Sequence, residues 1–326
     1  MHLNKKDLEK ALSALAAEME VFVPGTVDDV RRFVLWEGGA PDLGGANTEL
    51  PPKDILFPET EKMYAYRLGE NLSYSELGEA PKRVVFGIRP CDMQSIARMD
   101  SVFIKEGEED SFYASRRANC VTVALSCPES GENCFCEAMG TDPNAAPGAD
   151  VFLTDAGDSY MVTANGDKGK SVTELWKGLL TDGKEVKGNT HNTLKPNVPK
   201  DMPEKLLSIF EQDIWSKVSK PCLGCGTCTF VCPTCYCFDI NIDSTGNEGV
   251  TFRCWDSCMF TDYNRIAGGI NERPTKKERL RNRYMHKLSY YNQRYGAMLC
   301  VGCGRCITKC PAHLDIAEFI NKAAEV

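Results

Sequence analysis

Two cysteine runs near the C-terminus have the spacing of iron–sulfur ligands. The first run is Cys222, Cys225, Cys228 and Cys232, followed by Pro233, and the second is Cys300, Cys303, Cys306 and Cys310, followed by Pro311. In bacterial ferredoxins this C-x2-C-x2-C-x3-C-P pattern binds two [4Fe–4S] clusters, and the fourth cysteine of each run ligates the cluster of the other run. We therefore predict one cluster on Cys222, Cys225, Cys228 and Cys310, and a second on Cys300, Cys303, Cys306 and Cys232. Zinc knuckles fit less well, because they favour paired C-x2-C units and often use histidine.

Glycines lie between the first three cysteines of both runs, at Gly224, Gly226, Gly302 and Gly304. Glycine reaches positive φ angles at little cost, and successive backbone N–H groups in such turns surround anions. This pattern predicts loops whose N–H groups close around the inorganic sulfides of a cluster.

Four further cysteines in the N-terminal part are candidates for a third [4Fe–4S] cluster. Residues 83–88 and 121–126 have the composition of buried strands, and Cys91 and Cys127 follow their ends. If these strands are parallel neighbours, both thiols reach one edge of the sheet, together with Cys134 and Cys136. The same four residues could instead bind zinc or be buried, unreactive thiols. A cluster here would lie in a separate domain from the C-terminal pair, at one end of an electron path.

Five cysteines have no assigned ligand role: Cys120, Cys235, Cys237, Cys254 and Cys258. Cys120 starts the predicted strand and points away from the candidate third site. The other four follow the first run at spacings that match no cluster pattern. We expect them to pack beside the first run, where thiols tune a cluster's potential.

The elements that position these cysteines predict an α+β protein with two domains. Residues 1–200 should form a mixed α/β domain, with helices at 4–20, 92–99 and 171–180 and a hairpin over 151–163. Residues 201–326 should form a helical ferredoxin-like domain with two clusters. Helices are expected at 204–217 and 314–324, and an insert of about 238–299 is expected to be helical as well.

The bulk composition excludes several classes of protein. The chain has 326 residues, a formal net charge of −8 and 17 cysteines. This charge does not suit nucleic acid, and a chain of this size is not a small disulfide scaffold. No apolar run approaches the ~20 residues that span a bilayer. The N-terminus has the pattern of an amphipathic helix and not of a signal peptide, so we expect a reducing, anaerobic cytoplasm.

Motifs spread over most of the chain resemble one family. They are residues 56–61 (LFPETE), 86–92 (FGIRPCD), 134–136 (CFC), 224–228 (GCGTC), 235–239 (CYCFD), 279–287 (RLRNRYMHK) and 300–306 (CVGCGRC). The chain resembles the iron–sulfur β subunits of sulfhydrogenases and the A subunits of anaerobic sulfite reductases. The resemblance implies a non-catalytic electron carrier, and it favours a third cluster on Cys91, Cys127, Cys134 and Cys136.

We therefore predict an electron-transfer subunit of a soluble multi-subunit oxidoreductase. It would pass electrons between a flavin and NAD(P)H subunit and a catalytic or ferredoxin-like partner, because a flavin splits a hydride into single electrons. One alternative is an enzyme subunit that binds its own flavin or substrate in the N-terminal domain. A second is a zinc-binding structural or nucleic-acid-binding protein. The terminal donor and acceptor are not predicted.

A basic segment and four histidines remain. Residues 271–287 contain seven Lys and Arg residues, which suit a docking face for an acidic partner, cations that raise a cluster's potential, or a solvated helix. The histidines are His2, His191, His286 and His313, and none pairs with another at metal-ligand spacing. We expect each to have a structural role.

Overall fold

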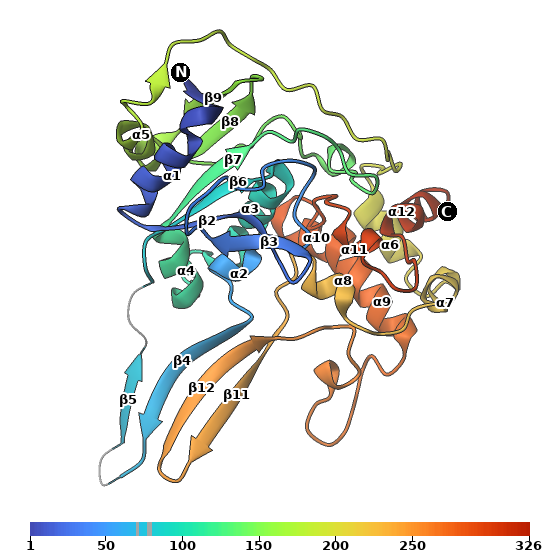
Figure 1. Cartoon of the computed structure of the whole chain (residues 1–326). Helices are drawn as coiled ribbons and strands as arrows, with labels where there is room; N and C mark the ends of the chain where they lie inside the picture. Colours follow the sequence, from blue (N-terminus) through green and yellow to red (C-terminus); the bar gives the residue numbers. More distant parts are fainter. Residues whose placement is uncertain (70–71, 77–79) are drawn as a thin grey trace.

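A mixed eight-stranded sheet forms the N-terminal half of the computed structural model, which describes residues 1–69, 72–76 and 80–326 (Figure 1). The strands are ordered β10-β1-β9-β8-β7-β6-β2-β3. They are β1 (His2–Asn4), β2 (Glu20–Val27), β3 (Val30–Leu35), β6 (Arg83–Ile88), β7 (Cys120–Leu125), β8 (Val151–Asp155), β9 (Ser159–Ala164) and β10 (Leu180–Thr181). β2, β6, β7 and β8 run parallel. The predicted parallel pairing of β6 and β7 is confirmed, as is the predicted β8–β9 hairpin.

Helices cover both faces of this sheet, so its central strands are apolar on both sides, as buried parallel strands are. α1 (Leu8–Ala16) and α5 (Gly166–Leu175) belong to one core, which includes Val84 and Phe86 of β6. α2 (Lys53–Leu56), α3 (Pro90–Phe103) and α4 (Ser111–Ala118) contribute to the opposite core, with Val85 and Ile88. The predicted helices at 4–20, 92–99 and 171–180 are therefore present, with shifted ends. Gly87, at φ +80°, carries the register shift that lets Phe86 and Ile88 face opposite cores.

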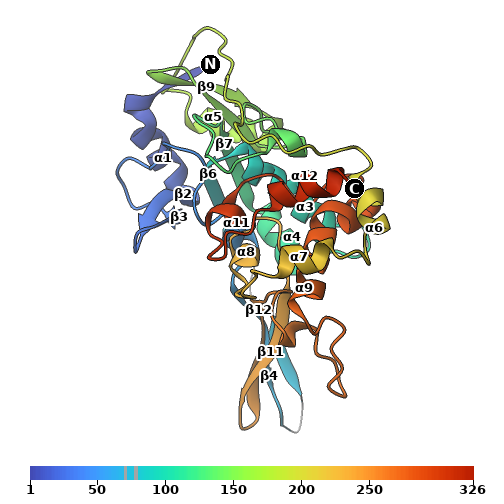
Figure 2. The same cartoon turned by 90° about the vertical axis from the view of Figure 1, so that its right-hand side faces the viewer.

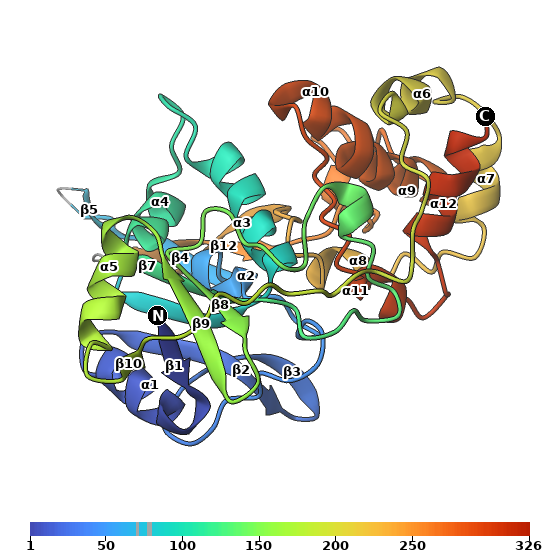
Figure 3. The ribbon, with the colours of Figure 1, turned by 90° about the horizontal axis from the view of Figure 1, so that it is seen from above.

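The C-terminal helices gather beside the large sheet (Figure 3). They are α6 (Met202–Ser208), α7 (Ile214–Ser219), α8 (Thr227–Phe230), α9 (Lys276–Met285), α10 (Tyr291–Tyr295), α11 (Arg305–Thr308) and α12 (Ile316–Ala324). Their core is aromatic: the Phe319 ring lies 4.9 Å from that of Trp215 and 4.7 Å from that of Tyr284, between ring centroids. The single helix predicted over 204–217 is two helices, α6 and α7. The indole N–H of Trp215, in α7, donates to the Ile209 carbonyl, at the end of α6, at 2.9 Å and so links the two helices.

The insert between the cysteine runs is helical only in its second part, so the prediction for 238–299 is wrong in its first part. β11 (Phe238–Thr245) and β12 (Glu248–Trp255) form a hairpin there. Alternation of apolar and polar residues along 238–243, followed by Gly246-Asn247, is the pattern of a strand and a two-residue turn. The hairpin joins β4 (Thr60–Arg67) and β5 (Ser73–Glu76) in a second sheet, ordered β11-β12-β4-β5. This sheet extends away from the rest of the molecule (Figures 1 and 2).

Contacts of this second sheet cross the proposed domain boundary near residue 200. β12 pairs with β4 along almost its full length. The buried Arg253 guanidinium bonds Glu61 at 2.5 Å and Asp110 at 2.5 Å, which ties β12 to β4 and to the start of α4. Breaking a buried ion pair leaves an uncompensated charge and costs about 3–5 kcal/mol.

Within the described ranges, no helix combines the length and apolar character needed to span a bilayer.

Candidate iron–sulfur centres

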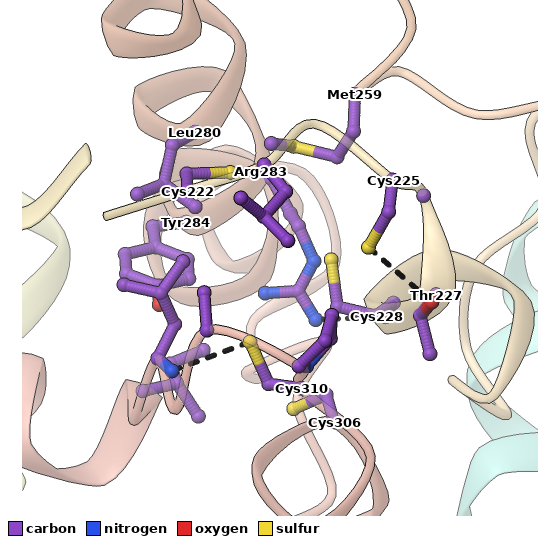
Figure 4. A pocket seen from close by; sticks show the side chains of 16 residues that line it. Cys222, Cys225, Thr227, Cys228, Met259, Leu280, Arg283, Tyr284, Cys306 and Cys310 are labelled. Carbon is purple, nitrogen blue, oxygen red and sulfur yellow. Dashed lines mark hydrogen bonds between the residues drawn. The ribbon is translucent and has the colours of Figure 1, made fainter. Parts of the chain in front are cut away.

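The four cysteines predicted for one cluster line a single cavity. Cys222, Cys225, Cys228 and Cys310 line this cavity together with Cys306, Arg283, Tyr284 and Met259. Figure 4 shows their sulfur atoms around the Arg283 side chain. Cys222 and Cys225 come from the loop between α7 and α8, Cys228 lies in α8, and Cys310 follows α11. The chain thus brings the last cysteine of the second run to the first run, as the crossed pattern requires.

Backbone N–H groups already point at sulfur in this first cavity. The Gly224 N–H donates to the Cys222 Sγ at 3.4 Å, and the Leu314 N–H donates to the Cys310 Sγ at 3.2 Å. Gly224 and Gly226 have φ angles of +71° and +77°, which disfavour other residues. Hydrogen bonds to sulfur are one of the means by which a protein sets a cluster's potential.

The second predicted set lines a neighbouring cavity. Its cysteines are Cys300, Cys303, Cys306 and Cys232, and its wall includes Phe135, Arg283, Lys287 and Ile316. Cys306 and Arg283 line both cavities. The two cavities are therefore adjacent, with one cysteine and one guanidinium in the wall between them.

The glycines of the second run serve a purpose that the sequence did not indicate. A Cβ atom on Gly302 would lie 2.5 Å from the Phe135 carbonyl oxygen, and one on Gly304 would lie 2.5 Å from the Asn133 carbonyl oxygen. The Phe135 N–H also donates to the Gly302 carbonyl at 2.8 Å. Both glycines thus let the second run pack directly on the backbone of 133–136, beside Cys134 and Cys136.

The four N-terminal candidate cysteines lie near one another and against the second run. Cys91 and Cys136 form a small buried cluster with Val301, and Cys303 packs against it. Burial raises the pKa of Cys136 to about 12, and nearby Cys134 and Cys127 contribute. This group therefore packs directly on the second run, because the glycines of that run permit close approach.

Thiols of the N-terminal group are hydrogen-bonded to other groups of the protein. The Cys127 thiol donates to the Glu129 carbonyl at 3.0 Å, and the Cys136 thiol donates to the Asn192 amide oxygen at 3.2 Å. Asn47 donates to the Cys303 carbonyl at 2.8 Å and lies 3.8 Å from the Cys91 Sγ. A cluster ligand must be a deprotonated thiolate, so these bonds would have to be exchanged on binding. Nothing in its sequence neighbourhood singles out Asn47, which reaches this site through the loop after β3.

Buried cations surround the two C-terminal cavities and have no carboxylate partner. Within the described part of the chain, no Asp or Glu oxygen lies within 4.0 Å of Arg283, Lys287 or Lys53. Lys287 donates to the Thr234 carbonyl and hydroxyl at 2.9 Å each, and Lys53 donates to the Cys235 carbonyl at 3.0 Å. Burial lowers the pKa of Lys53 to about 8. Buried cations need counter-charge, and thiolate-ligated clusters would supply it, so the residues present fit this cofactor.

Two buried arginines lie beside the N-terminal group, and only one of them is neutralised. Arg89 donates only to backbone carbonyls within the described residues. Arg305 makes a two-pronged ion pair with Asp92, at 2.6 and 2.7 Å, and both side chains are buried. Asp92 belongs to the R-P-C-D motif at the start of α3, directly after Cys91. The pair joins the second run to α3. The sequence does not indicate this pair, because Arg305 lies between two predicted ligands and Asp92 is 213 residues away.

The remaining cysteines have mixed surroundings. Cys235 is buried beside Cys232, and Cys258 is buried beside Cys237. A hydrogen bond from Cys258 lowers the pKa of Cys237 to about 6. Cys254 accepts from the Asn241 amide at 3.4 Å, and burial raises the pKa of Cys120 to about 11. Across the described residues, no three His, Cys, Asp or Glu side chains are close enough to hold one metal ion.

The basic segment is not a uniformly solvated helix. Arg279, Arg283 and Lys287 are buried on the side of α9 and its continuation that faces the cavities. His286, in the same segment, bonds the Tyr236 hydroxyl at 2.9 Å, and burial lowers its pKa to about 3. His2 bonds Ser159 and the Lys184 carbonyl, and His191 bonds Glu137.

Comparison with known proteins defines the class first. Residues 221–314 match the 4Fe-4S dicluster domain family, which spans both cysteine runs and both cavities. The chain is also 32% identical over 295 residues to sulfhydrogenase 2 subunit beta of Pyrococcus furiosus, covering 87% of this chain and 85% of that protein. The chain therefore belongs to the family of sulfhydrogenase β subunits, and the resemblance read from its motifs is confirmed. No solved structure matches the chain.

Proposed function

We propose that this chain is the electron-transfer iron–sulfur subunit of a soluble, cytoplasmic, multi-subunit oxidoreductase. The supporting observation is that each crossed cysteine set lines its own cavity, and that the two cavities share Cys306 and Arg283. When bound, [4Fe–4S] clusters supply reversible one-electron transfer. The chain supplies thiolates, N–H donors to sulfur and buried positive charge.

We further propose a third cluster on Cys91, Cys127, Cys134 and Cys136, which gives a linear electron path. Cys303 packs against Cys91 and Cys136, and Cys306 lines the cavity of the first run. The order is then the N-terminal site, the site of Cys300 and its partners, and the site of Cys222 and its partners. Electrons would enter at one end of this path and leave at the other.

The proposed partners are a flavin and NAD(P)H subunit and a catalytic or ferredoxin-like subunit. A relative in Pyrococcus furiosus is named as one subunit of a sulfhydrogenase, which supports assembly with other chains. A flavin is needed wherever a two-electron hydride donor feeds one-electron centres.

Anaerobic purification with iron and sulfide analysis tests this function. We expect about twelve iron and as many acid-labile sulfides per chain, from three clusters of four. About eight would retain the C-terminal pair and reject the third site. Zinc without sulfide would reject the function altogether, and a yellow, iron-independent chromophore in the isolated chain would favour a subunit with its own flavin.

A further inference from the structure

We propose that Arg283 is a positioning residue shared by both C-terminal clusters, whose single positive charge raises the reduction potential of both. This inference rests on the proposed function, since it assumes clusters in the two cavities. It goes beyond that function by naming one residue whose charge affects the reduction potentials of both clusters.

The position of Arg283 supports this role. It lines both cavities, and its side chain is almost fully buried at 3% exposure. One terminal nitrogen donates to the Cys228 carbonyl at 2.9 Å, which holds the guanidinium against the first run. The Nε is buried and has no partner within the described residues. A buried donor without a partner costs about 1–3 kcal/mol, and a cluster sulfur in either cavity would satisfy it.

The charge of Arg283 is not cancelled locally. No carboxylate oxygen lies within 4.0 Å of it in the described chain, whereas Arg305 is matched by Asp92. One-electron reduction adds one negative charge to a cluster, and the electron comes from the partner subunit's donor. A cation in a region of low dielectric favours that added charge strongly, and it acts on every cluster within reach. Because Arg283 borders both cavities, it acts on both.

Two neighbours in the basic segment are matched controls. Lys287 is also a buried cation without a carboxylate, but it lines only the second cavity. Arg281 belongs to the same helix as Arg283 and lies against Phe210, with its guanidinium 3.8 Å from that ring centroid and bonded to the Phe210 carbonyl. Removal of the charge is therefore expected to have a different outcome at each of Arg283, Lys287 and Arg281.

The test is an EPR-monitored redox titration, with dithionite as reductant, on the anaerobically purified wild-type chain and on Arg283→Gln, Lys287→Gln and Arg281→Gln. For Arg283→Gln we expect both C-terminal midpoints to fall by at least a tenfold change in the reduction equilibrium, which is 59 mV for one electron. Lys287→Gln should lower only the midpoint of the cluster on Cys300, Cys303, Cys306 and Cys232. Arg281→Gln should change neither.

Iron content separates the possible failures. Wild-type protein with fewer than eight irons would reject the proposed function itself. If the wild-type and variant proteins both hold eight or more irons, the clusters are present. In that case, a shift of only one midpoint, or of neither, in Arg283→Gln would overturn the shared role of Arg283 and leave the proposed function standing. If Arg283→Gln loses iron, the Arg283→Lys variant, which keeps the positive charge, is titrated in its place. Midpoints of the two C-terminal clusters that stay unchanged or fall together support the proposal. A shift of only one of the two midpoints overturns it.

Discussion

The two C-terminal cysteine sets and the N-terminal cysteine group lie in adjacent parts of the molecule, but their hydrogen bonds and neighbouring charges differ. Each C-terminal set lines a cavity walled by cations that have no carboxylate partner. In the N-terminal group, three thiols are hydrogen-bonded to protein acceptors, and the arginine of the second run, Arg305, is paired with Asp92. Arg89, buried beside Cys91 and Cys127, donates only to backbone carbonyls. Within the described residues the N-terminal group therefore has one buried cation without a carboxylate partner, and the C-terminal cavities are lined by two, Arg283 and Lys287.

This difference has a consequence for electron transfer. Uncompensated cations favour the reduced, more negative state of a cluster, and a paired cation does so much less. Both Arg283 and Lys287 line the cavity of Cys300, Cys303, Cys306 and Cys232, so the cluster there would be the easiest of the three to reduce.

Loss of the N-terminal site should have the largest effect on function. Cys134→Ala should reduce the iron content from about twelve to about eight, spare the C-terminal pair and abolish electron flow between partner subunits. Assembly of the complex should survive, because the substitution removes one thiol and leaves the helical region unchanged. Turnover with the natural donor, together with iron analysis, measures both effects.

Cys120→Ala is the matched control, because Cys120 is a fully buried cysteine outside the four-cysteine set. It should keep all its iron and its turnover. Normal turnover of the Cys134→Ala complex would mean that the N-terminal cysteines are structural and that the two regions do not form one path.

The crossed ligands of the C-terminal pair give the next largest effect. Cys310→Ser should change the EPR signal of the cluster on Cys222, Cys225 and Cys228, because Cys310 lines that cavity and not the other. Cys232→Ser should change the other signal. A reversed assignment, with Cys310→Ser acting on the cluster of its own run, would show that the two runs do not interleave.

The contrast between the two regions also explains what the sequence could predict. Regular spacing within each run predicted both crossed sets, because the ligands are local and the glycines between them favour one loop shape. The strand ends that carry Cys91 and Cys127 were predictable from apolar runs. The approach of Gly302 to Phe135 was not, because it depends on tertiary packing between segments 167 residues apart in sequence. The β11–β12 hairpin was missed, although its alternation and Gly-Asn turn were readable.

The contact between the two regions can be tested at this glycine. Gly302→Ala places a Cβ 2.5 Å from the Phe135 carbonyl oxygen at a φ of +64°. Backbone strain and overpacking together should lower the free energy of unfolding by roughly 2–5 kcal/mol, and the EPR signal of the N-terminal cluster should change as well. Gly296→Ala is the control, with φ +71° but open space around its Cβ, and should cost only about 1–2 kcal/mol. Equal losses in the two variants would mean that the segments are not in tight contact.

The C-terminal region should also respond to acid through a partly buried histidine, His286. Burial, then the charge of Lys287, lowers the pKa of His286 from 6.5 to about 3, so the folded state keeps this imidazole neutral. The unfolded chain binds the proton below pH 6.5, and stability therefore falls as the pH falls. Between pH 7.5 and 5.5 this loss is about 1.4 kcal/mol, which His286→Gln should remove while still bonding the Tyr236 hydroxyl. Denaturant unfolding at the two pH values measures it. A His286→Gln protein that loses as much stability as the wild type would mean that the acid sensitivity of this region has another source.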